Sequence, residues 1–373
     1  MSSEPPKSIR VLILTASMGE GHNTAARNIR DAILAERPGQ AEVLVADPYT
    51  RTNPIVNRLM QSGYTMAINR YPRAWKVIFQ LLSRRGVVEG MGPMLAELTA
   101  AVRGLIQEFR PDVIVSTYPV FSFLNAKIRK SNPAMKVPFY TVITDSTLIN
   151  SAWYRCPCEG SIVADEQTAE VLRKDGVPPE KIHVLGFPVG LDFELHQPAE
   201  ATLPWKVLFV PSGTPDRAVA SLHLLSKLDN VVVDVVTGRR KAMHAAIAAA
   251  GLPLAGTLTG WTDQMPHLMA SHHLFIGKAG GATVQEAIAA QIPFVVNHVV
   301  PGQEEGNIAF IEQTGIGSLA GNSAEQVFQQ TKGAFANHGA IWHAWKKNLL
   351  VLQKPSASRA IARFVLDRAA VSL

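Results

Sequence analysis

A stretch of about thirty residues carries side chains suited to binding a phosphorylated ligand. An apolar run from His273 to Ile276 precedes Lys278-Ala-Gly-Gly-Ala, where paired glycines let the backbone turn tightly and approach a ligand. The helix expected next would offer unpaired amide hydrogens and the positive end of its dipole to an anion. Lys278 would add a full positive charge. The pattern favours a phosphate site made by Lys278, Gly280, Gly281, Ala282 and Thr283.

Further carboxylates and amides follow this turn. Glu286 lies one helical turn after Thr283, where its carboxylate could accept hydrogen bonds from a ribose diol. Thr283-x-x-Glu286 is also the spacing of a capping box, in which Thr283 caps the helix and Glu286 binds a backbone amide. A second strand is expected from Ile292 to Val296, and ligands bind beyond the carboxyl ends of such strands. The loop there, which could also be merely solvated, contains Gln303, Glu304 and Asn307.

His22 is a candidate general base near the start of the chain. It lies in Gly19-Glu-Gly-His-Asn-Thr, after an expected strand from Ile9 to Thr15. The positive dipole at a helix start lowers the pKa of an imidazole and keeps it neutral and basic, although the histidine could also only cap the helix. The glycines do not fit a dinucleotide fingerprint, because Thr24 occupies the place of its third small residue. Asp145 ends another expected strand and could lie near His22, to orient its ring or bind sugar.

Composition indicates a globular protein with two domains. The chain has 373 residues, of which 47% are hydrophobic and 18% charged. It has no run of about eighteen apolar residues that would span a membrane, and its N-terminus lacks the apolar centre of a secretory signal, so we expect a cytoplasmic protein.

Two cysteines, Cys156 and Cys158, are too few for a structural zinc site and are not spaced as a redox motif. We therefore expect no metal.

Residues 48–88 form a basic segment without any Asp or Glu. Seven Lys and Arg residues alternate there with apolar and aromatic side chains. Such a stretch is typical of an element on an anionic membrane surface, where each basic residue contributes roughly 1 kcal/mol. A solvated helical hairpin packed on its own domain is the alternative, and nucleic acid is disfavoured because no binding motif accompanies the charge. We assign the membrane contact to Arg70, Arg73, Trp75 and Lys76.

Strands and helices alternate in both halves of the chain, which predicts two α/β domains with parallel sheets. The first domain is expected over residues 1–193. A polar, proline-flanked linker follows over residues 194–204. The second domain is expected over residues 205–340. The helical pattern of residues 341–373, broken near Lys354-Pro355, is expected to cross back to the first domain.

Two motifs resemble those of a known family. Lys278-Ala-Gly-Gly-Ala-Thr-Val-Gln-Glu286 with Pro301-Gly-Gln-Glu-Glu-Gly-Asn307 is similar to the nucleotide-sugar signature of the monogalactosyldiacylglycerol synthase and processive diacylglycerol glucosyltransferase family, glycosyltransferase family 28. Gly19-Glu-Gly-His resembles that family's N-terminal motif. The enzyme that adds N-acetylglucosamine to lipid I is a more distant relative. The resemblance covers most of residues 8–330 and implies the GT-B fold, with two Rossmann-like domains whose parallel sheets face a central cleft.

The resemblance also implies an activity. It is the inverting transfer of a hexose, glucose or galactose, from a UDP-sugar to diacylglycerol or a related lipid, without an essential metal. The implied catalytic residues are His22 as base and Asp145, and the acceptor side includes Tyr118. The glycine turn would face the diphosphate, Glu286 the ribose and Gln303-Glu304 the sugar. The implied donor-binding residues are Gly213, Trp261, Lys278, Gly280, Gly281, Ala282, Thr283, Glu286, Gln303, Glu304 and Asn307.

Several departures from the family pattern leave the lipid acceptor and the sugar open. Tyr118 and Asn150 stand where the family has histidine, and Gly190 replaces an arginine. The loop after Val210 keeps only Gly213 of a richer glycine loop. The cations Arg239-Arg240-Lys241 could face phosphates or only water.

Two other classes of function share parts of the pattern. A nucleotide-sugar isomerase of the UDP-N-acetylglucosamine 2-epimerase type would share the fold but would not need the basic segment. A non-catalytic regulator that binds lipid and nucleotide sugar is the second.

We expect the protein at the inner face of the cell membrane, bound peripherally.

Overall fold

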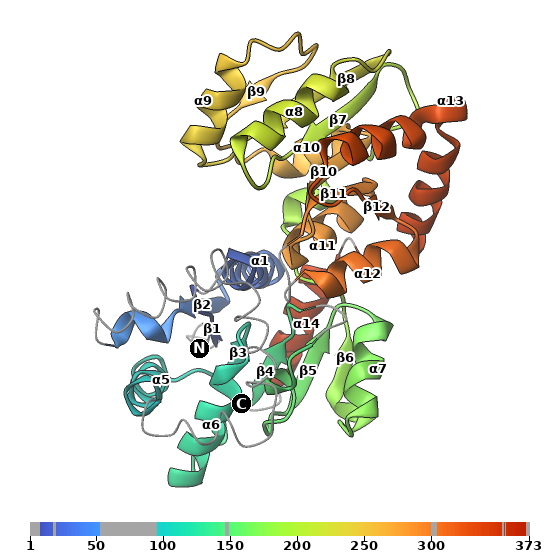
Figure 1. The fold of residues 1–373 in the computed structure, drawn as a ribbon. Coiled ribbons are helices and arrows are strands. Elements are labelled where there is room, and N and C mark those ends of the chain that lie inside the picture. Colours follow the sequence, from blue (N-terminus) through green and yellow to red (C-terminus); the bar gives the residue numbers. More distant parts are fainter. Residues whose placement is uncertain are drawn as a thin grey trace, which may run out of the picture. The chain divides into compact units, whose positions relative to one another are not determined.

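The computed structural model describes residues 8–17, 20–52, 95–145, 149–299, 304–352, 354 and 356–370. They divide into two compact units, one within Met1–Leu191 and Ser356–Leu373 and the other within Asp192–Pro355. Figure 1 shows that each unit is a sheet covered by helices, which confirms the α/β class predicted from the alternating pattern.

The first unit is built on a parallel sheet. Its described strands follow the order β2-β1-β3-β4-β5-β6, and every neighbouring pair is parallel. Residues 11–14 of β1 and all of β3 are buried, which explains their continuous apolar sequences. The strands are β1 (Ile9–Leu14), β2 (Ala41–Ala46), β3 (Val113–Ser116), β4 (Phe139–Val142), β5 (Gly160–Val163) and β6 (Ile182–Val184).

Helices form separate apolar clusters with this sheet, one of which joins α7 to β5 and β6. Another cluster joins residues of α5 and α6 to β1, β3 and β4. A third joins α1 and the distant α14, with Ile29 and Ile33 packed with Ile361 and Val365. The helices are α1 (Glu20–Glu36), α5 (Ala96–Phe109), α6 (Val120–Ser131), α7 (Glu166–Lys174) and α14 (Ala357–Ala370). Short 3-10 turns are η1 (Pro48–Arg51), η2 (Ser151–Trp153), η3 (Pro179–Lys181) and η4 (Leu191–Glu194), the last of which runs into the second unit.

The second unit has a parallel sheet of the same size. Its described strands follow the order β12-β11-β10-β7-β8-β9. The strands are β7 (Trp205–Phe209), β8 (Val231–Val236), β9 (Leu258–Thr259), β10 (Leu274–Lys278), β11 (Phe294–His298) and β12 (Gly317–Leu319). The helices are α8 (Pro215–Leu225), α9 (Lys241–Ala249), α10 (Met265–Ser271), α11 (Gly281–Ala289), α12 (Glu305–Thr314) and α13 (Ala324–Leu352).

Helix α13 is interrupted by four residues with non-helical backbone angles, from Ala336 to Gly339. Gly339 has a φ of +75°, and a side chain there would meet the ring of Trp205. The interruption therefore lets the chain pass close to the start of β7.

Glu36 joins α1 to α14 and gives a test of this packing. Its carboxylate accepts hydrogen bonds from Arg359 Nη1 at 3.0 Å and from Arg363 Nε at 2.7 Å, and its side chain is 15% exposed. The hydrogen bond from Arg363, joined by that from Arg359, holds the pKa of Glu36 below its ordinary value. The carboxylate form is therefore stabilised by folding, and this stabilisation is lost as pH falls through the lowered pKa.

We expect Glu36→Gln to lower the free energy of unfolding by on the order of 1 kcal/mol at pH 7. The difference from wild type should shrink below about pH 4, because the wild-type carboxylate then becomes protonated too. Thermal unfolding followed by circular dichroism measures both. Glu166→Gln is the matched control, since the Glu166 side chain is 68% exposed in its pair with Arg173. Equal losses for the two variants would contradict a specific role for Glu36.

Candidate active site

Three neighbouring strands of the first unit position His22. The residue lies in the first turn of α1, after β1. Its ring Nδ1 is 2.8 Å from Thr144 Oγ1, just beyond β4, and its carbonyl accepts a hydrogen bond of 3.1 Å from Thr117 Oγ1, just beyond β3. Because β1, β3 and β4 are parallel neighbours, their carboxyl ends meet at one edge of the sheet. His22 is therefore fixed at both its backbone and its ring.

The charge state of His22 is set mainly by burial. Removal from water lowers its pKa below the ordinary value, and the charge of Asp145 and a hydrogen bond to the backbone of Thr117 oppose this only in part. The ring is therefore neutral at pH 7 and can accept a proton. The sequence predicted a lowered pKa from the helix dipole, whereas burial is the larger cause.

Asp145 lies near His22 without a hydrogen bond to it among the described residues. Thr144 makes the contact to the His22 ring instead. Asp145 Oδ2 accepts a short hydrogen bond, 2.6 Å, from Trp153 Nε1. Burial raises the pKa of Asp145, while the charge of His22 and the bond from Trp153 act in the opposite direction. The aspartate thus acts on His22 through its charge, and its orientation comes from Trp153.

Aromatic rings line the same side of His22. Tyr118 meets the imidazole edge-on at a centroid distance of 5.1 Å, and Trp153 lies at 6.0 Å. Tyr49 packs against Tyr118 at 6.3 Å. The sequence analysis assigned Tyr118 to the acceptor side, and the structure places it against the candidate base. Trp153 and Thr144 were missed, although Thr144 adjoins Asp145 in the sequence.

Asn150, which departs from the family pattern, has a structural role here. It is 7% exposed, and its side-chain oxygen accepts a hydrogen bond of 2.9 Å from the amide of Ala152. This contact caps the 3-10 turn η2, whose last residue is Trp153. The turn presents the Trp153 ring to Asp145, so Asn150 supports the site through that contact.

In the second unit, the glycine turn corrects the predicted helix start. Helix α11 begins at Gly281, with Gly280 as its N-cap. Thr283 is therefore inside the first turn and does not cap the helix, so the capping-box interpretation is wrong. A Cβ placed at Gly280 would lie 3.5 Å from Lys278 Nζ and 3.6 Å from Thr283 Oγ1. Both polar groups thus stand around the turn.

Among the described residues, the Glu286 carboxyl group has no hydrogen-bond partner. Burial raises the pKa of its carboxyl group to about 7. With the capping role removed, this carboxylate is available to a ligand, as the ribose assignment requires. Ala282 follows Gly281 in the same first turn of α11.

Three other predicted donor residues contact one another or the turn itself. Lys278 Nζ forms an ion pair of 2.8 Å with Glu304 Oε1, and the Glu304 side chain is only 6% exposed. Asn307 Nδ2 donates a hydrogen bond of 2.9 Å to the carbonyl of Ala279. The start of α12 is therefore fastened to the turn before α11. The positive charge of Lys278 is compensated by Glu304 rather than open to an anion.

Trp261 follows the edge strand β9 and is 60% exposed. The Arg239 guanidinium lies over its ring, 5.6 Å from the centroid. An exposed indole beside a guanidinium suits stacking against a base. Trp261 is one of the donor-binding residues that the family resemblance implies, and its exposed ring is consistent with that assignment.

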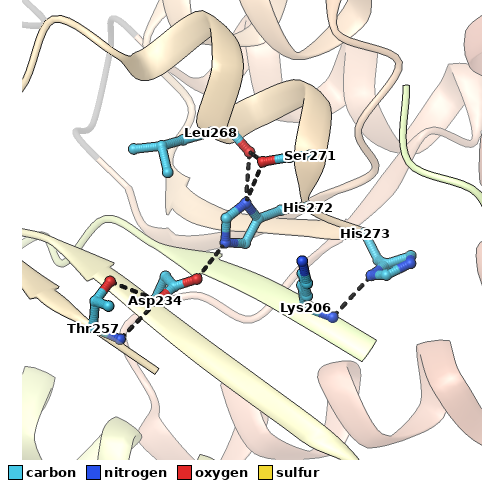
Figure 2. Close-up of polar contacts among 7 residues, drawn as sticks. All are labelled: Lys206, Asp234, Thr257, Leu268, Ser271, His272 and His273. Carbon is cyan, nitrogen blue, oxygen red and sulfur yellow. Dashed lines mark hydrogen bonds and ion pairs between the residues drawn. The ribbon is translucent and has the colours of Figure 1, made fainter. Parts of the chain in front are cut away.

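A polar network that includes the buried ring of His272, shown in Figure 2, holds the strand before Trp261. Asp234 on β8 accepts hydrogen bonds from Thr257 N at 2.7 Å and from Thr257 Oγ1 at 2.6 Å. Its other oxygen lies 2.8 Å from His272 Nε2, and His272 Nδ1 lies 2.6 Å from the carbonyl of Leu268. Burial alone would raise the pKa of Asp234, but the hydrogen bonds from Thr257 and His272 hold it below the ordinary value. The network, which the sequence analysis missed, joins β8, α10 and the start of β9.

Some predicted residues lie outside the described part of the chain. These are Gln303 and the membrane-contact residues Arg70, Arg73, Trp75 and Lys76. Gly213 lies in the loop after β7 with a φ of +82°. No described helix is both long and apolar enough to cross a membrane.

The raised pKa of Glu286 predicts a pH-dependent stability. An acid whose pKa rises on folding makes the folded protein less stable as pH increases from its unfolded pKa to about 7. We expect Glu286→Gln to raise the melting temperature at pH 8, where the buried charge is removed, and to change it little at pH 5. Differential scanning calorimetry at the two pH values tests this, with the exposed Glu180→Gln as control. A variant destabilised equally at both pH values would contradict it.

The chain is similar to several known proteins. A family model described as monogalactosyldiacylglycerol (MGDG) synthase matches residues 22–189, which begin at His22. The processive diacylglycerol beta-glucosyltransferase of Bacillus subtilis (strain 168) is 26% identical over 369 residues, covering 96% of this chain and 94% of that protein. Monogalactosyldiacylglycerol synthase 3, chloroplastic, of Arabidopsis thaliana is 25% identical over 372 residues, covering 93% of this chain and 78% of that protein.

The fold is similar to that of solved glycosyltransferases. The crystal structure of MurG from Acinetobacter baumannii aligns with a TM-score of 0.64 at 14% identity, over 96% of this chain and 100% of that one. This likeness shows the fold alone, and it confirms the predicted GT-B class. The matched family model and the relatives that span most of the chain make this protein similar to the monogalactosyldiacylglycerol synthase and processive diacylglycerol glucosyltransferase family.

Proposed function

We propose that this protein is an inverting glycosyltransferase that moves a hexose, glucose or galactose, from a UDP-sugar to diacylglycerol or a closely related lipid. Similarity to the family supports the reaction class. The observation that carries the mechanism is the neutral imidazole of His22, fixed by Thr117 and Thr144 at the carboxyl edge of the first sheet. An unactivated lipid hydroxyl requires such a base, because it is a poor nucleophile until its proton leaves.

His22 would act through its Nε2 atom. The ring Nδ1 is engaged with Thr144 Oγ1, so a proton held on Nδ1 and donated to that hydroxyl leaves the lone pair on Nε2. The acceptor oxygen would bond to the anomeric carbon as the bond from that carbon to the diphosphate oxygen breaks, with inversion. The hydroxyl proton passes to Nε2. The nearby charge of Asp145 then favours the imidazolium that forms.

The donor would bind to the second unit. The backbone amides from Gly280 to Thr283 are suited to the diphosphate, and Glu286 to the ribose. Glu304, fixed by Lys278, would hold a sugar hydroxyl. We expect no essential metal, because amides and protein cations can meet the charge of the leaving diphosphate.

The acceptor would reach the first unit from a membrane. Tyr118 stands against His22 and offers a ring to an apolar acceptor. The basic and aromatic composition of residues 48–88 supports contact with an anionic leaflet, with the protein bound peripherally at the inner face.

The reaction itself is tested by measuring UDP release. We expect release from UDP-glucose or UDP-galactose to depend on vesicles that contain diacylglycerol, and to persist in EDTA. Anionic vesicles should support a higher rate than zwitterionic ones, with the difference disappearing at high salt. Conversion of a UDP-sugar to its epimer without UDP release would contradict the proposal in favour of an isomerase. Binding without turnover would favour a regulator.

His22→Ala should separate catalysis from donor binding. A positioned base typically contributes 10²–10⁴-fold, so we expect turnover to fall by at least about a hundredfold while the affinity for UDP stays near wild type. Since the pKa of His22 is lowered, wild-type turnover should decline only as pH falls below about 6.5. His223→Ala, at an exposed position on α8, is the matched control. Near-normal turnover in His22→Ala would show that another group, with Asp145 the first candidate, takes the proton.

A further inference from the structure

Two arginines donate hydrogen bonds to the loop that follows β7 in the second unit. Arg217, in the first turn of α8, donates from Nη2 to the carbonyl of Ser212 at 2.8 Å. Arg240, just before α9, donates from Nη1 to the carbonyl of Pro211 at 2.9 Å and from Nη2 to that of Gly213 at 2.5 Å. The two guanidiniums thus contact three consecutive residues of one loop at the carboxyl edge of the sheet.

Neither guanidinium has an anionic partner among the described residues. Besides the loop carbonyls, Arg217 Nη2 contacts only His298 Nδ1, at 3.0 Å. His298 Nδ1 also lies 2.8 Å from Asn322 Oδ1, so a guanidinium nitrogen and an amide oxygen share this ring atom. Burial without a compensating charge lowers the pKa of Arg217. Two positive charges are therefore held at this loop with no carboxylate partner among the described residues.

Both guanidiniums keep donors for a ligand. Each has five N–H groups and directs at most two of them to protein acceptors, which leaves at least three. Arg240 is exposed and Arg217 partly exposed, so both side chains reach solvent. A planar guanidinium with free donors matches two phosphate oxygens at once.

The neighbouring cations of this edge are already occupied. Lys278 pairs with the buried carboxylate of Glu304 at 2.8 Å. Arg239 lies over the ring of Trp261. The countercharge for an anion at this edge therefore comes from the loop after β7 rather than from the lysine before the glycine turn.

The single glycine of this loop is explained by the same contact. Gly213 has a φ of +82°, and a Cβ there would overlap Arg217 Nη2. A loop with more glycines would present backbone amides to a diphosphate, whereas here glycine makes room for a guanidinium. The guanidinium of Arg217 therefore takes the place of backbone amides that a loop with a single glycine does not present.

We propose that Arg217 and Arg240 form a diphosphate clamp, and that they supply the charge that holds the donor's phosphates and stabilises the departing nucleoside diphosphate. The identity of the nucleotide rests on the proposed function. The ligand class, a diphosphate, rests on the geometry of the two arginines.

Calorimetric titration with uridine, UDP and inorganic pyrophosphate tests the clamp. For Arg240→Gln we expect the Kd of UDP and of pyrophosphate to rise at least about tenfold, as for lost charge-assisted hydrogen bonds, with uridine binding unchanged. Arg217→Lys should weaken both phosphate ligands too, because lysine keeps the charge and loses the planar fork. The matched control is Lys241→Gln, which removes the same charge from the next, exposed residue and should stay within about twofold of wild type.

The outcomes distinguish this inference from the proposed function. If Arg240→Gln and Arg217→Lys keep wild-type melting temperatures and bind UDP and pyrophosphate as wild type does, the clamp is wrong while the donor proposal stands. If wild type binds pyrophosphate through these arginines and does not bind UDP, the clamp stands and the proposed donor is wrong. Failure of wild type to bind either ligand would overturn both.

Discussion

Parallel pairing of the strands is the constraint on which the candidate residues of each unit depend. In a parallel sheet every strand ends at the same edge, so residues that follow different strands come together without being near in sequence. Thr144 and His22 are 122 residues apart, yet their side chains meet at 2.8 Å because β1, β3 and β4 are neighbours. In the second unit the same rule gathers Gly213, Arg240 and Lys278, which follow or end β7, β8 and β10. The candidate functional residues of each unit therefore lie at the carboxyl edge of its sheet.

Burial then decides which groups at these edges are charged. It lowers the pKa of His22, raises that of Asp145, and raises that of Glu286 to about 7. Burial acts toward the neutral form in each case, and at Asp145 the charge of His22 and the hydrogen bond from Trp153 act in the opposite direction. The arginines at the loop after β7 are the exception, because guanidinium cannot lose its proton at accessible pH. In the proposed reaction, fixed positive charge would meet the anionic donor, and a base kept neutral would meet the acceptor hydroxyl.

The sequence predicted what depends on local pattern. Apolar runs indicated parallel strands, and the alternation of elements gave the α/β class that the structure confirms. His22 and Glu286 were predicted as site residues because their neighbours form recognisable turns, and these two assignments stay predictions. The helix start at Gly281 could not be separated from one at Thr283, since a threonine and a glutamate three residues apart fit a cap as well as they fit an interior turn. Strands β5 and β6 were missed, because Gly160-Ser and Ile182-His-Val carry little apolar pattern.

The sequence pattern could not predict which side chains contact each other. Lys278 and Glu304 were each assigned to the donor, and only the register of β10 and the start of α12 shows that they bind each other. The pair has a physical reason. The Glu304 side chain is 6% exposed, and an ionised carboxylate at that depth is costly unless a cation partners it. Lys278 is half exposed and so stays hydrated while it provides this charge. A lysine committed in this way cannot also neutralise a diphosphate without leaving Glu304 unpaired, so the two tasks must fall to different cations. The loop after β7 supplies them, since its arginines are held by carbonyls, which orient a guanidinium without cancelling its charge.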